Sequence, residues 1–530
     1  MLIYYVIAPI LIAVFLYFFS AKVGRVIAIV AQTLFVLAAF YLLYYTHNTP
    51  YGEVITNVGN FRSYLGIYLM ADNLAAVFVL LSSIVFLAAA VFSINEKRSS
   101  LFWFLLFIWQ AALVGLFLTR DFFNIFVMAE VATVVVAILL MYERENRRIY
   151  NGMIFLMTNV VAIQFYLFGI GYLYMITGRM DMQAAAEVIQ YLEPAQLYLA
   201  YALIMTAIAF KCALLPLSSW FVKVSSVPRA PVAIATILSA LHVKGGIYLF
   251  IRFQGIFGEL IPNEFYIVIG VITGIIGVIM ALAQKDILLT LAYSSVAQIG
   301  LIMIGLNMDS DYARAGANLH LINHAIFKAA LFFGAGIISQ SYNTRNMGSI
   351  RGVWRRDKIV TIAQILAILG IIGMPFFNGS ISKYFMAADA SLPLTIAMVI
   401  INLGTILVYL KYVSIFRGKA ATAEIPYKPD RYGQSVILIL GVACLAFGIF
   451  GPWLNNYLFD TNLSVSTRGY IEKSLIFAAS LAVGLLIVRF AKPVNNWLEK
   501  FNNRINLGFR GICASIGAFF GIILIAAALI

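Results

Sequence analysis

The sequence predicts an all-α polytopic membrane protein. Of its 530 residues, 63% are hydrophobic and only 11% are charged, whereas soluble proteins have about 25% charged residues. Apolar runs long enough for a membrane helix, which needs about 20 residues, follow one another with short links between them. These observations exclude a soluble enzyme, a nucleic-acid-binding protein and a disordered chain.

Each apolar run between polar breaks predicts one membrane span, and sixteen spans can be placed. The first run has neither the basic start nor the cleavage site of a signal peptide, so it is expected to be a span. The predicted spans are 2–20, 26–46, 66–94, 101–119, 121–141, 150–176, 196–217, 229–252, 264–283, 287–307, 316–339, 359–386, 393–416, 433–456, 471–490 and 511–530.

Spans seven and twelve are expected to be broken helices. Pro216 interrupts the seventh, and Gly373, Pro375 and Gly379 interrupt the twelfth. Such residues release backbone groups that other parts of the protein must then bind. Broken membrane helices often line the paths of ions or substrates.

The lysines inside the spans suggest an internal repeat. Lys211 precedes Lys383 by nearly the same number of residues as Lys244 precedes Lys411. Each repeat would hold five spans, and an odd number of spans inverts the second copy relative to the membrane.

The predicted organisation is a core of about 14 membrane helices, followed by two further C-terminal spans. Trp497, Phe501 and Ile505 recur among polar residues and predict a short amphipathic surface helix. The expected regions are 1–100 (helices 1–3), 101–252 (first repeat, helices 4–8), 264–416 (inverted second repeat, helices 9–13) and 433–530 (helices 14–16, with the surface helix at about 492–510).

The net charge of +14 has a membrane explanation. The loops after odd-numbered spans hold 24 of the 36 Lys and Arg residues, and the opposite loops hold 7. Cytoplasmic loops are enriched in Lys and Arg. The protein is therefore expected in the cell (cytoplasmic or inner) membrane with both termini outside, and no nucleic-acid partner is needed to explain its charge.

The cysteines predict neither a disulfide framework nor a metal centre. Cys212, Cys444 and Cys513 are scattered through apolar runs and form no CxxC pair. We therefore expect no metal and no cofactor, and no catalytic centre within this chain.

Charged residues inside the spans are the candidates for function. Each costs roughly 2.5–3.5 kcal/mol at mid-helix, and Glu130 is the one acid near the middle of a span. A static ion pair is the structural alternative, and Lys411, near a span end, could reach the membrane surface. The lysines within spans are Lys211, Lys244, Lys328, Lys383 and Lys411.

The histidines extend this set. His320, His324 and Lys328 recur every four residues, so they lie on one stripe of a helix and could form a proton or cation path. A zinc site is the alternative, but no carboxylate or thiol lies nearby in sequence to complete its ligand shell. His242 lies on a different helix face from Lys244 and could be a packed polar residue.

Six motifs occur in an order that resembles a known family. The sequence is similar, over roughly residues 66–420, to the antiporter-like subunits shared by Mrp-type sodium/proton antiporters (their D-type and A-type subunits), respiratory complex I and membrane-bound hydrogenases. The motifs are DFFNIFVMAE (121–130), the stretch from KCALLPLSSW to GGIYLFIR (211–252), LAYSSVAQIG (291–300), HLINHAIFKAALFF (320–333), TRNMGSIRGVW (344–354) and GMPFFNGSISK (373–383).

The resemblance implies a role for each candidate residue. Glu130 would pair with Lys211, and Lys244 would continue a hydrated path. The stripe of His320, His324 and Lys328 would link two half-channels. Lys383 would be the titrating group at the exit, a place where some members of the family have glutamate.

Three functions follow as alternatives. The first is an ion-translocating subunit of a multisubunit Mrp-type complex, moving protons or exchanging them for sodium. The second is a proton-pumping subunit of a redox-driven complex, such as a membrane-bound hydrogenase, a sulfur-reducing complex or an NADH:quinone oxidoreductase. The third is a stand-alone carrier for an organic solute. In the first two, the expected partners are other membrane subunits, including related antiporter-like subunits, and the lipid bilayer.

Overall fold

The computed structural model describes residues 1–60, 66–96, 98–142, 145–225, 227, 230–258, 260–418, 428–490 and 507–529. Within these residues, 14 helices are long and apolar enough to cross a membrane. Two shorter apolar helices, Ile3–Tyr17 and Lys358–Ile372, coincide with the first and twelfth predicted spans. The predicted all-α membrane fold is confirmed. The interior of a bilayer holds no water that could bind the backbone of these apolar runs. A helix solves this because its backbone groups form hydrogen bonds with one another.

The chain divides into two compact units. Unit 1 comprises Met1–Ile234, Leu241–Pro262 and Leu507–Ile530, and unit 2 comprises Ala235–Ala240 and Asn263–Asn506. The predicted amphipathic helix at about 492–510 lies, up to residue 506, outside the described residues.

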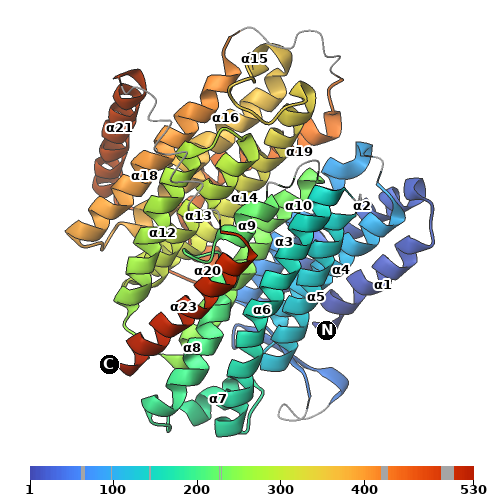
Figure 1. The fold of residues 1–530 in the computed structure, drawn as a ribbon, viewed down its shortest axis with the longest axis vertical. Coiled ribbons are helices and arrows are strands. Elements are labelled where there is room, and N and C mark those ends of the chain that lie inside the picture. Colours follow the sequence, from blue (N-terminus) through green and yellow to red (C-terminus); the bar gives the residue numbers. More distant parts are fainter. Residues whose placement is uncertain are drawn as a thin grey trace. The chain divides into compact units, whose positions relative to one another are not determined.

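The first part of the chain forms the following elements (Figure 1): α1 (Ile3–Tyr17), α2 (Ala21–His47), β1 (Glu53–Asn57), η1 (Val58–Asn60), β2 (Tyr68–Asp72), α3 (Asn73–Phe92), η2 (Ser93–Asn95), α4 (Ser100–Leu118), α5 (Phe122–Met141), α6 (Asn146–Thr177), α7 (Met182–Ile189), α8 (Pro194–Lys211), α9 (Ser219–Ser225), α10 (Val232–Ile237), η3 (Leu238–His242) and α11 (Val243–Phe257). The last helix, α23 (Phe509–Ala528), packs against α8 and α6 within unit 1 (Figure 1).

The second part of the chain forms the following elements: α12 (Asn263–Ala283), α13 (Ile287–Leu306), α14 (Asp311–Tyr342), α15 (Val353–Arg356), α16 (Lys358–Ile372), α17 (Asn378–Met386), α18 (Leu392–Val413), η4 (Ser414–Phe416), α19 (Arg431–Ile449), α20 (Gly451–Phe459) and α21 (Thr467–Phe490). In unit 2, α14 packs against α13, α16, α17 and α19. Helix α21 packs against α18 (Figure 1).

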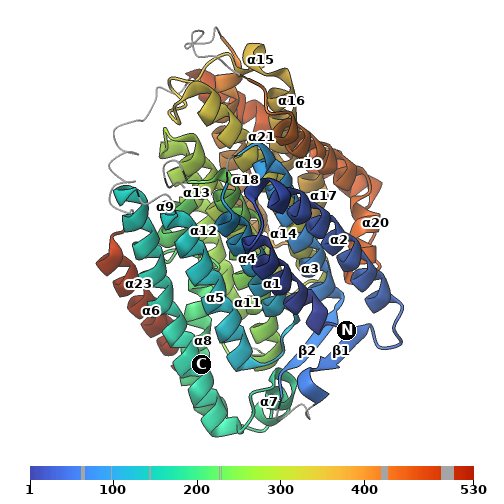
Figure 2. The same ribbon diagram turned by 90° about the vertical axis from the view of Figure 1, so that its right-hand side faces the viewer.

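The third predicted span, 66–94, begins too early, because its first residues belong to a short β-hairpin. Strands β1 and β2 pair antiparallel, with Glu53 opposite Asp72 and Asn57 opposite Tyr68. The amide of Leu2 donates to Thr56 Oγ1 (3.3 Å), so the start of the chain lies beside the hairpin (Figure 2). Asp72 then caps α3 by accepting a hydrogen bond from the Ala75 amide (2.9 Å), and this cap fixes the start of the helix.

Several other membrane helices also begin at a side-chain cap. Asp121 accepts from the Asn124 amide at the start of α5, and Asp357 accepts from the Val360 amide at the start of α16. Such caps satisfy amide groups that have no partner within the helix. The polar residues that flank the apolar runs thus set where these helices begin.

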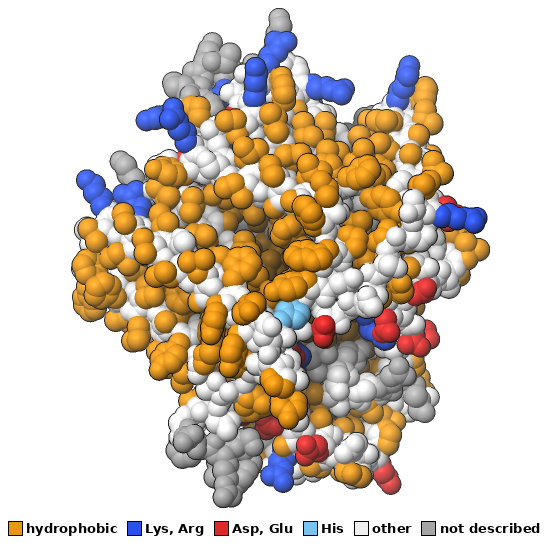
Figure 3. Space-filling view, turned by 180° about the vertical axis from the view of Figure 1, so that it is seen from behind, with side chains coloured by type: hydrophobic (Ala, Val, Ile, Leu, Met, Phe, Trp, Pro, Cys, Tyr) orange, Lys and Arg blue, Asp and Glu red, His pale blue; other side chains and the backbone are white. Residues whose placement is uncertain are grey.

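Exposed apolar side chains cover much of the surface. Figure 3 shows a face that is largely hydrophobic, with Lys and Arg side chains gathered towards its margins. Large apolar groups such as Tyr4, Leu34 and Phe168 are more than half exposed. This distribution is expected of helices that face lipid.

The chain departs from helical geometry at two points near charged residues. Helix α8 ends at Lys211, and the next helix begins only at Ser219. Helix α16 ends at Ile372, where Gly373 has φ 82°, and α17 begins at Asn378. Lys211 is therefore the last residue of the helix before the first interruption, and Lys383 lies on the helix that follows the second.

Candidate functional site

In unit 1, Lys211 is buried and bound by neutral oxygen atoms. Its Nζ donates to Thr133 Oγ1 on α5 and to Asn159 Oδ1 on α6, both at 2.9 Å. The side chains that hold it thus come from two other helices. Neither of these two acceptors was predicted from the sequence.

Glu130 lies one helical turn before Thr133 on α5, on the same side of that helix. Its Oε1 is buried and has no hydrogen-bond partner within the described chain. The carboxylate interacts electrostatically with Lys211, although the hydrogen bonds of Lys211 go to Thr133 and Asn159. The resemblance implied a Glu130–Lys211 pair, and within the described chain these two groups interact electrostatically without a direct hydrogen bond.

A cavity of about 20 Å³ lies between these helices and is lined by Lys211 and His242. That volume accommodates about one water molecule. His242 accepts a hydrogen bond at Nδ1 from Trp109 Nε1 (3.3 Å). An accepting Nδ1 fixes the tautomer that has its proton on Nε2, and Nε2 is a buried atom that makes no hydrogen bond to the described residues.

Helix α11 approaches Lys211 closely because Gly246 has no side chain. A Cβ atom at Gly246 would lie 2.6 Å from Cys212 N and 2.9 Å from Lys211 Cβ. Lys244 precedes it by two residues and is only 1% exposed. Lys244 also lies two residues after the end of a π-helical segment, Leu238–His242. Such segments frequently occur at functional sites.

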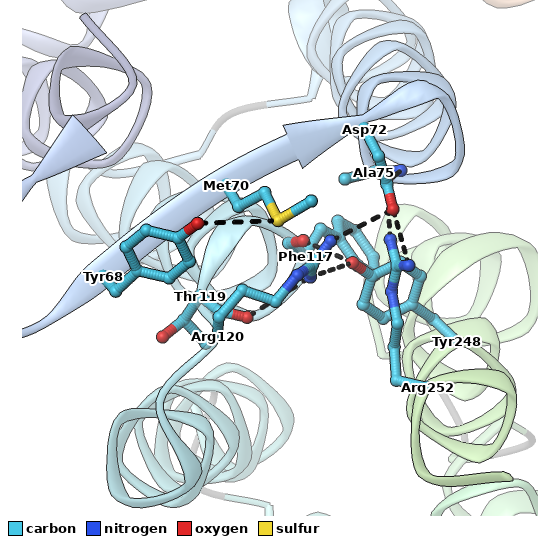
Figure 4. A network of polar contacts seen from close by, with 9 residues as sticks. All are labelled: Tyr68, Met70, Asp72, Ala75, Phe117, Thr119, Arg120, Tyr248 and Arg252. Atoms are coloured by element: carbon cyan, nitrogen blue, oxygen red, sulfur yellow. Dashed lines mark hydrogen bonds and ion pairs between the residues drawn. The ribbon is translucent and has the colours of Figure 1, made fainter. Parts of the chain in front are cut away.

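An ion triad fixes one end of α11 (Figure 4). Asp72 binds Arg252 through both carboxylate oxygens, each at 2.6 Å, and Arg120 at 3.3 Å. Arg252 lies over the ring of Tyr248 (4.8 Å), whose hydroxyl accepts from Arg120 (3.0 Å). Burial alone would raise the pKa of the Asp72 carboxyl, but the arginines and the Ala75 amide lower it from 3.8 to about 2.

The triad sets the position of two predicted residues. Lys244 lies eight residues before Arg252, about 12 Å along α11, and Glu130 lies ten residues after Arg120, mostly along α5. Since Asp72 joins both arginines, it sets the register of α11 against the start of α5. Sequence patterns carried no direct sign of this role, because Asp72 lies near the start of the predicted third span and not at its middle.

In unit 2, His320 is the centre of a hydrogen-bonded chain. Its Nδ1 contacts Ser382 Oγ (2.8 Å) and its Nε2 contacts Gln298 Oε1 (3.1 Å). Gln298 in turn donates to Thr405 Oγ1 (3.1 Å). His320 therefore connects α13, α14 and α17, and its partner Ser382 directly precedes Lys383.

The predicted stripe on α14 is buried as a unit. The His324 ring lies 6.5 Å from the His320 ring and 5.4 Å from the Phe327 ring. Lys328 is fully buried and donates to Leu291 O (2.9 Å) and to Tyr409 Oη (3.3 Å). All three members of the stripe thus lie in the interior of unit 2.

The two remaining lysines differ in their surroundings. Lys383 donates to Ile371 O and to Asn402 Oδ1, both at 2.7 Å. Lys411 donates to two backbone carbonyls at the end of α12, Leu282 O (2.8 Å) and Gln284 O. A lysine at the end of a helix stabilises the carbonyls there, so these two contacts give Lys411 a structural contribution.

Comparison with known proteins identifies the family. Residues 119–409 match the family model described as "NADH:quinone oxidoreductase/Mrp antiporter, TM". The chain is 30% identical to the N-type subunit of the NADH-quinone oxidoreductase of Desulforudis audaxviator, covering 73% of this chain and 82% of that one. It is 28% identical to the D-type subunit of the Na(+)/H(+) antiporter of Alkalihalophilus pseudofirmus, covering 73% and 80%.

The fold is shared with a solved respiratory complex. A chain of the archaeal membrane-bound sulfane sulfur reductase superposes with a TM-score of 0.80 at 21% identity, covering 91% of this chain and 99% of that one. The family resemblance inferred from the six motifs is confirmed. The chain belongs to the NADH:quinone oxidoreductase/Mrp antiporter transmembrane family.

Proposed function

We propose that the chain is an ion-translocating subunit of a multisubunit membrane complex of the Mrp type or related to it. It moves protons, alone or in exchange for sodium, through buried titratable groups. Glu130, Lys211 and Lys244 form the part of the path in unit 1. His320, His324, Lys328 and Lys383 form the part in unit 2.

One observation supports this proposal above the others. The hydrogen bonds that Lys211 and Lys383 make within the described chain go to neutral oxygen atoms of hydroxyl, amide and carbonyl groups. A buried ammonium bound to a carboxylate would leave an unpaired buried charge if it lost its proton, at a cost of several kcal/mol. With neutral acceptors, the neutral amine keeps donors for the same hydrogen bonds, so the proton can leave and return.

A redox-driven complex is the second candidate, because the relatives include a subunit of an NADH-quinone oxidoreductase and the fold matches a chain of a sulfur-reducing complex. In that case the same groups move protons while partner subunits perform the redox chemistry. The excess of Lys and Arg in alternate loops supports a cytoplasmic membrane location with both termini outside.

The test uses the complete complex in sealed membrane vesicles. Lys211→Ala and Glu130→Ala are expected to reduce proton transport, followed with a pH-sensitive dye, by at least about tenfold. Lys211→Arg is also expected to be inactive, because arginine retains the charge but does not release its proton. The exposed Lys22→Ala is the control. Wild-type transport by Lys211→Arg would contradict the proposed proton path.

The partners that copurify distinguish the two candidates. Membrane subunits without visible iron–sulfur absorbance would indicate an Mrp-type antiporter, and sodium-dependent proton release should then be measurable. Copurifying iron–sulfur proteins would indicate a redox-driven pump.

A further inference from the structure

Two aspartates lie side by side in unit 1, where the start of α5 meets the segment before α7. Asp121 and Asp181 are directly opposite each other in an isolated antiparallel β-bridge. The two backbone hydrogen bonds of this bridge (2.9 and 2.8 Å) are made by the residues that flank the aspartates, and not by the aspartates themselves. In such a pair the side chains lie on the same face and at their closest approach. The two carboxyl groups are therefore neighbours.

Each carboxyl group has one oxygen bound to the start of a helix. Asp121 Oδ1 accepts from the Asn124 amide of α5 (2.6 Å), and Asp181 Oδ1 accepts from the Ala184 amide of α7 (2.8 Å). The start of a helix stabilises a negative charge, so both caps favour the ionised form. Two like charges directly opposite each other across a bridge are, however, destabilising. The two caps and the bridge thus make opposing demands on this pair.

The second oxygen of Asp181 has no partner. Asp181 is 7% exposed, and its Oδ2 is buried without a hydrogen bond to the described residues. Of the arginines next to the pair in sequence, Arg120 donates to Asp72 and Tyr248, and the exposed Arg179 makes no ion pair within the described chain. A buried charged oxygen without a partner costs free energy. Its position therefore indicates a positively charged ligand that the described chain does not supply.

Unit 2 contains the same local structure with its charge balanced. Asp286 caps α13 through Oδ1 and forms an isolated bridge with Asn346. The residues that flank this bridge make the same two backbone hydrogen bonds, both at 2.9 Å. The distance in sequence from Asp121 to Asp286 equals that from Asp181 to Asn346. In unit 2, however, Arg345 binds Asp286 Oδ2 at 2.6 Å.

Unit 1 differs from unit 2 at the two positions that balance the charge. Met180 stands where unit 2 has Arg345, and Asp181 stands where unit 2 has Asn346. The bridge in unit 1 therefore lacks the guanidinium and has one additional carboxylate. The matching oxygen in unit 2 binds a cation, which indicates that a cation also belongs in unit 1 and must come from solution.

We propose that Asp121 and Asp181 bind a divalent metal cation of the calcium type, at the end of unit 1 that carries α7 and the β-hairpin (Figure 2). Calcium prefers oxygen ligands and is commonly bound by carboxylates, and two carboxylates balance its charge. Asp121 is only partly buried, so the pair can be reached from the surface. The ion joins the start of α5 to the segment before α7, and this structural role does not depend on the proposed ion path.

The affinity is expected to be low. The bridge lies between the fourth and fifth and between the sixth and seventh predicted spans, in loops with few Lys and Arg residues, which are expected outside the cell. Calcium sites in extracellular proteins have dissociation constants of about 10⁻⁴–10⁻³ M. Calcium chloride is therefore the probe, at up to about ten times that dissociation constant.

Thermal unfolding of the complete complex, in nanodiscs of zwitterionic lipid, tests the site. Calcium at ten times its dissociation constant should raise the unfolding temperature of the wild type by about 3 °C. Asp181→Asn should lose this shift, because asparagine keeps the cap of α7 but not the charge. Asp309→Asn is the matched control, because the Asp309 side chain is 99% exposed, and it should keep the shift. An equal calcium shift in the wild type and Asp181→Asn would overturn the proposal.

A second variant transfers the arrangement of unit 2 to unit 1. Met180→Arg combined with Asp181→Asn should be insensitive to calcium and, without calcium, should unfold at least about 2 °C above the wild type, because a guanidinium replaces the ion. Without calcium, Asp181→Asn alone should be no less stable than the wild type. A lower unfolding temperature for it would contradict the repulsion between the two carboxylates.

Other ions distinguish the remaining explanations. Sodium chloride at the same ionic strength should produce no shift that Asp181→Asn removes. A shift with sodium but not with calcium, or a wild type that responds to neither ion, would overturn the assignment to a divalent cation. Because these measurements do not require ion transport, failure of the proposed function would leave their result unchanged.

Discussion

The ion triad at Asp72 allows a quantitative test of how α11 is held. Asp72→Asn removes the carboxylate charge that binds Arg120 and Arg252 but keeps an oxygen that can cap α3. Asp72→Ala removes both. The difference between the two variants therefore separates the contribution of the charge from that of the helix cap.

The magnitude follows from the pKa of Asp72, which falls from 3.8 to about 2. Each pKa unit is worth about 1.4 kcal/mol, so the ionised form of Asp72, net of its burial, stabilises the folded state by roughly 2 kcal/mol. The loss of the cap in Asp72→Ala adds about 1 kcal/mol. For a large helical unit, each kcal/mol lowers the unfolding temperature by about 2 °C. We expect decreases of about 4 °C for Asp72→Asn and about 6 °C for Asp72→Ala.

The pH dependence has a defined sign. Because the folded-state pKa is lowered, the stabilisation is fully present above about pH 4 and is lost as the pH falls towards 2. The difference in unfolding temperature between wild type and Asp72→Asn should thus be constant from pH 5 to 8.

The assay is thermal unfolding of the purified complex in lipid nanodiscs, followed by tryptophan fluorescence. Asp309→Asn serves as the control, because the Asp309 side chain is 99% exposed. A decrease below about 1 °C for Asp72→Asn, or a difference that changes between pH 5 and 8, would refute this account of the triad.

Two further pairs of substitutions test the path itself. Gly246→Ala should lower stability by about 1–3 kcal/mol and reduce transport, because its Cβ would meet backbone atoms at 2.6 Å. The control, Gly245→Ala, should retain both stability and transport, because its Cβ would meet nothing closer than 3.9 Å. Lys383→Glu should retain part of the transport and Lys383→Gln should lose it, since glutamate titrates and glutamine does not. Transport is measured with a pH-sensitive dye in vesicles. Equal activity of the two variants would show that this position need not exchange a proton.

The membrane spans could be predicted because a bilayer makes a strict demand on length and polarity. The sixteen predicted runs correspond to the 14 long helices and two shorter apolar helices of the described chain. The hairpin was missed because Tyr68, Leu69 and Met70 are apolar and continue directly into the apolar sequence of α3. Only the cap at Asp72 separates the strand from the helix.

The candidate residues could be proposed from the sequence because a charge inside an apolar run is conspicuous. Their partners could not be predicted in the same way. Thr133, Asn159 and Asn402 are ordinary polar residues in membrane helices, where hydroxyl and amide groups often bond within the bundle. Which of them meets a lysine depends on how the helices pack, and the spacing of residues along one helix does not determine that.

In each unit, a buried lysine binds the side chain of an asparagine on another helix. Lys211 binds the amide oxygen of Asn159 on α6, and Lys383 binds that of Asn402 on α18. In the predicted repeat these lysines correspond, but α6 and α18, as the sixth and thirteenth spans, do not. The recurrence of an asparagine therefore does not follow from duplication of the sequence. A neutral amide oxygen binds both the ammonium and the amine, which a carboxylate does not do at similar cost, so we attribute the recurrence to a requirement for lysines that change protonation inside the membrane.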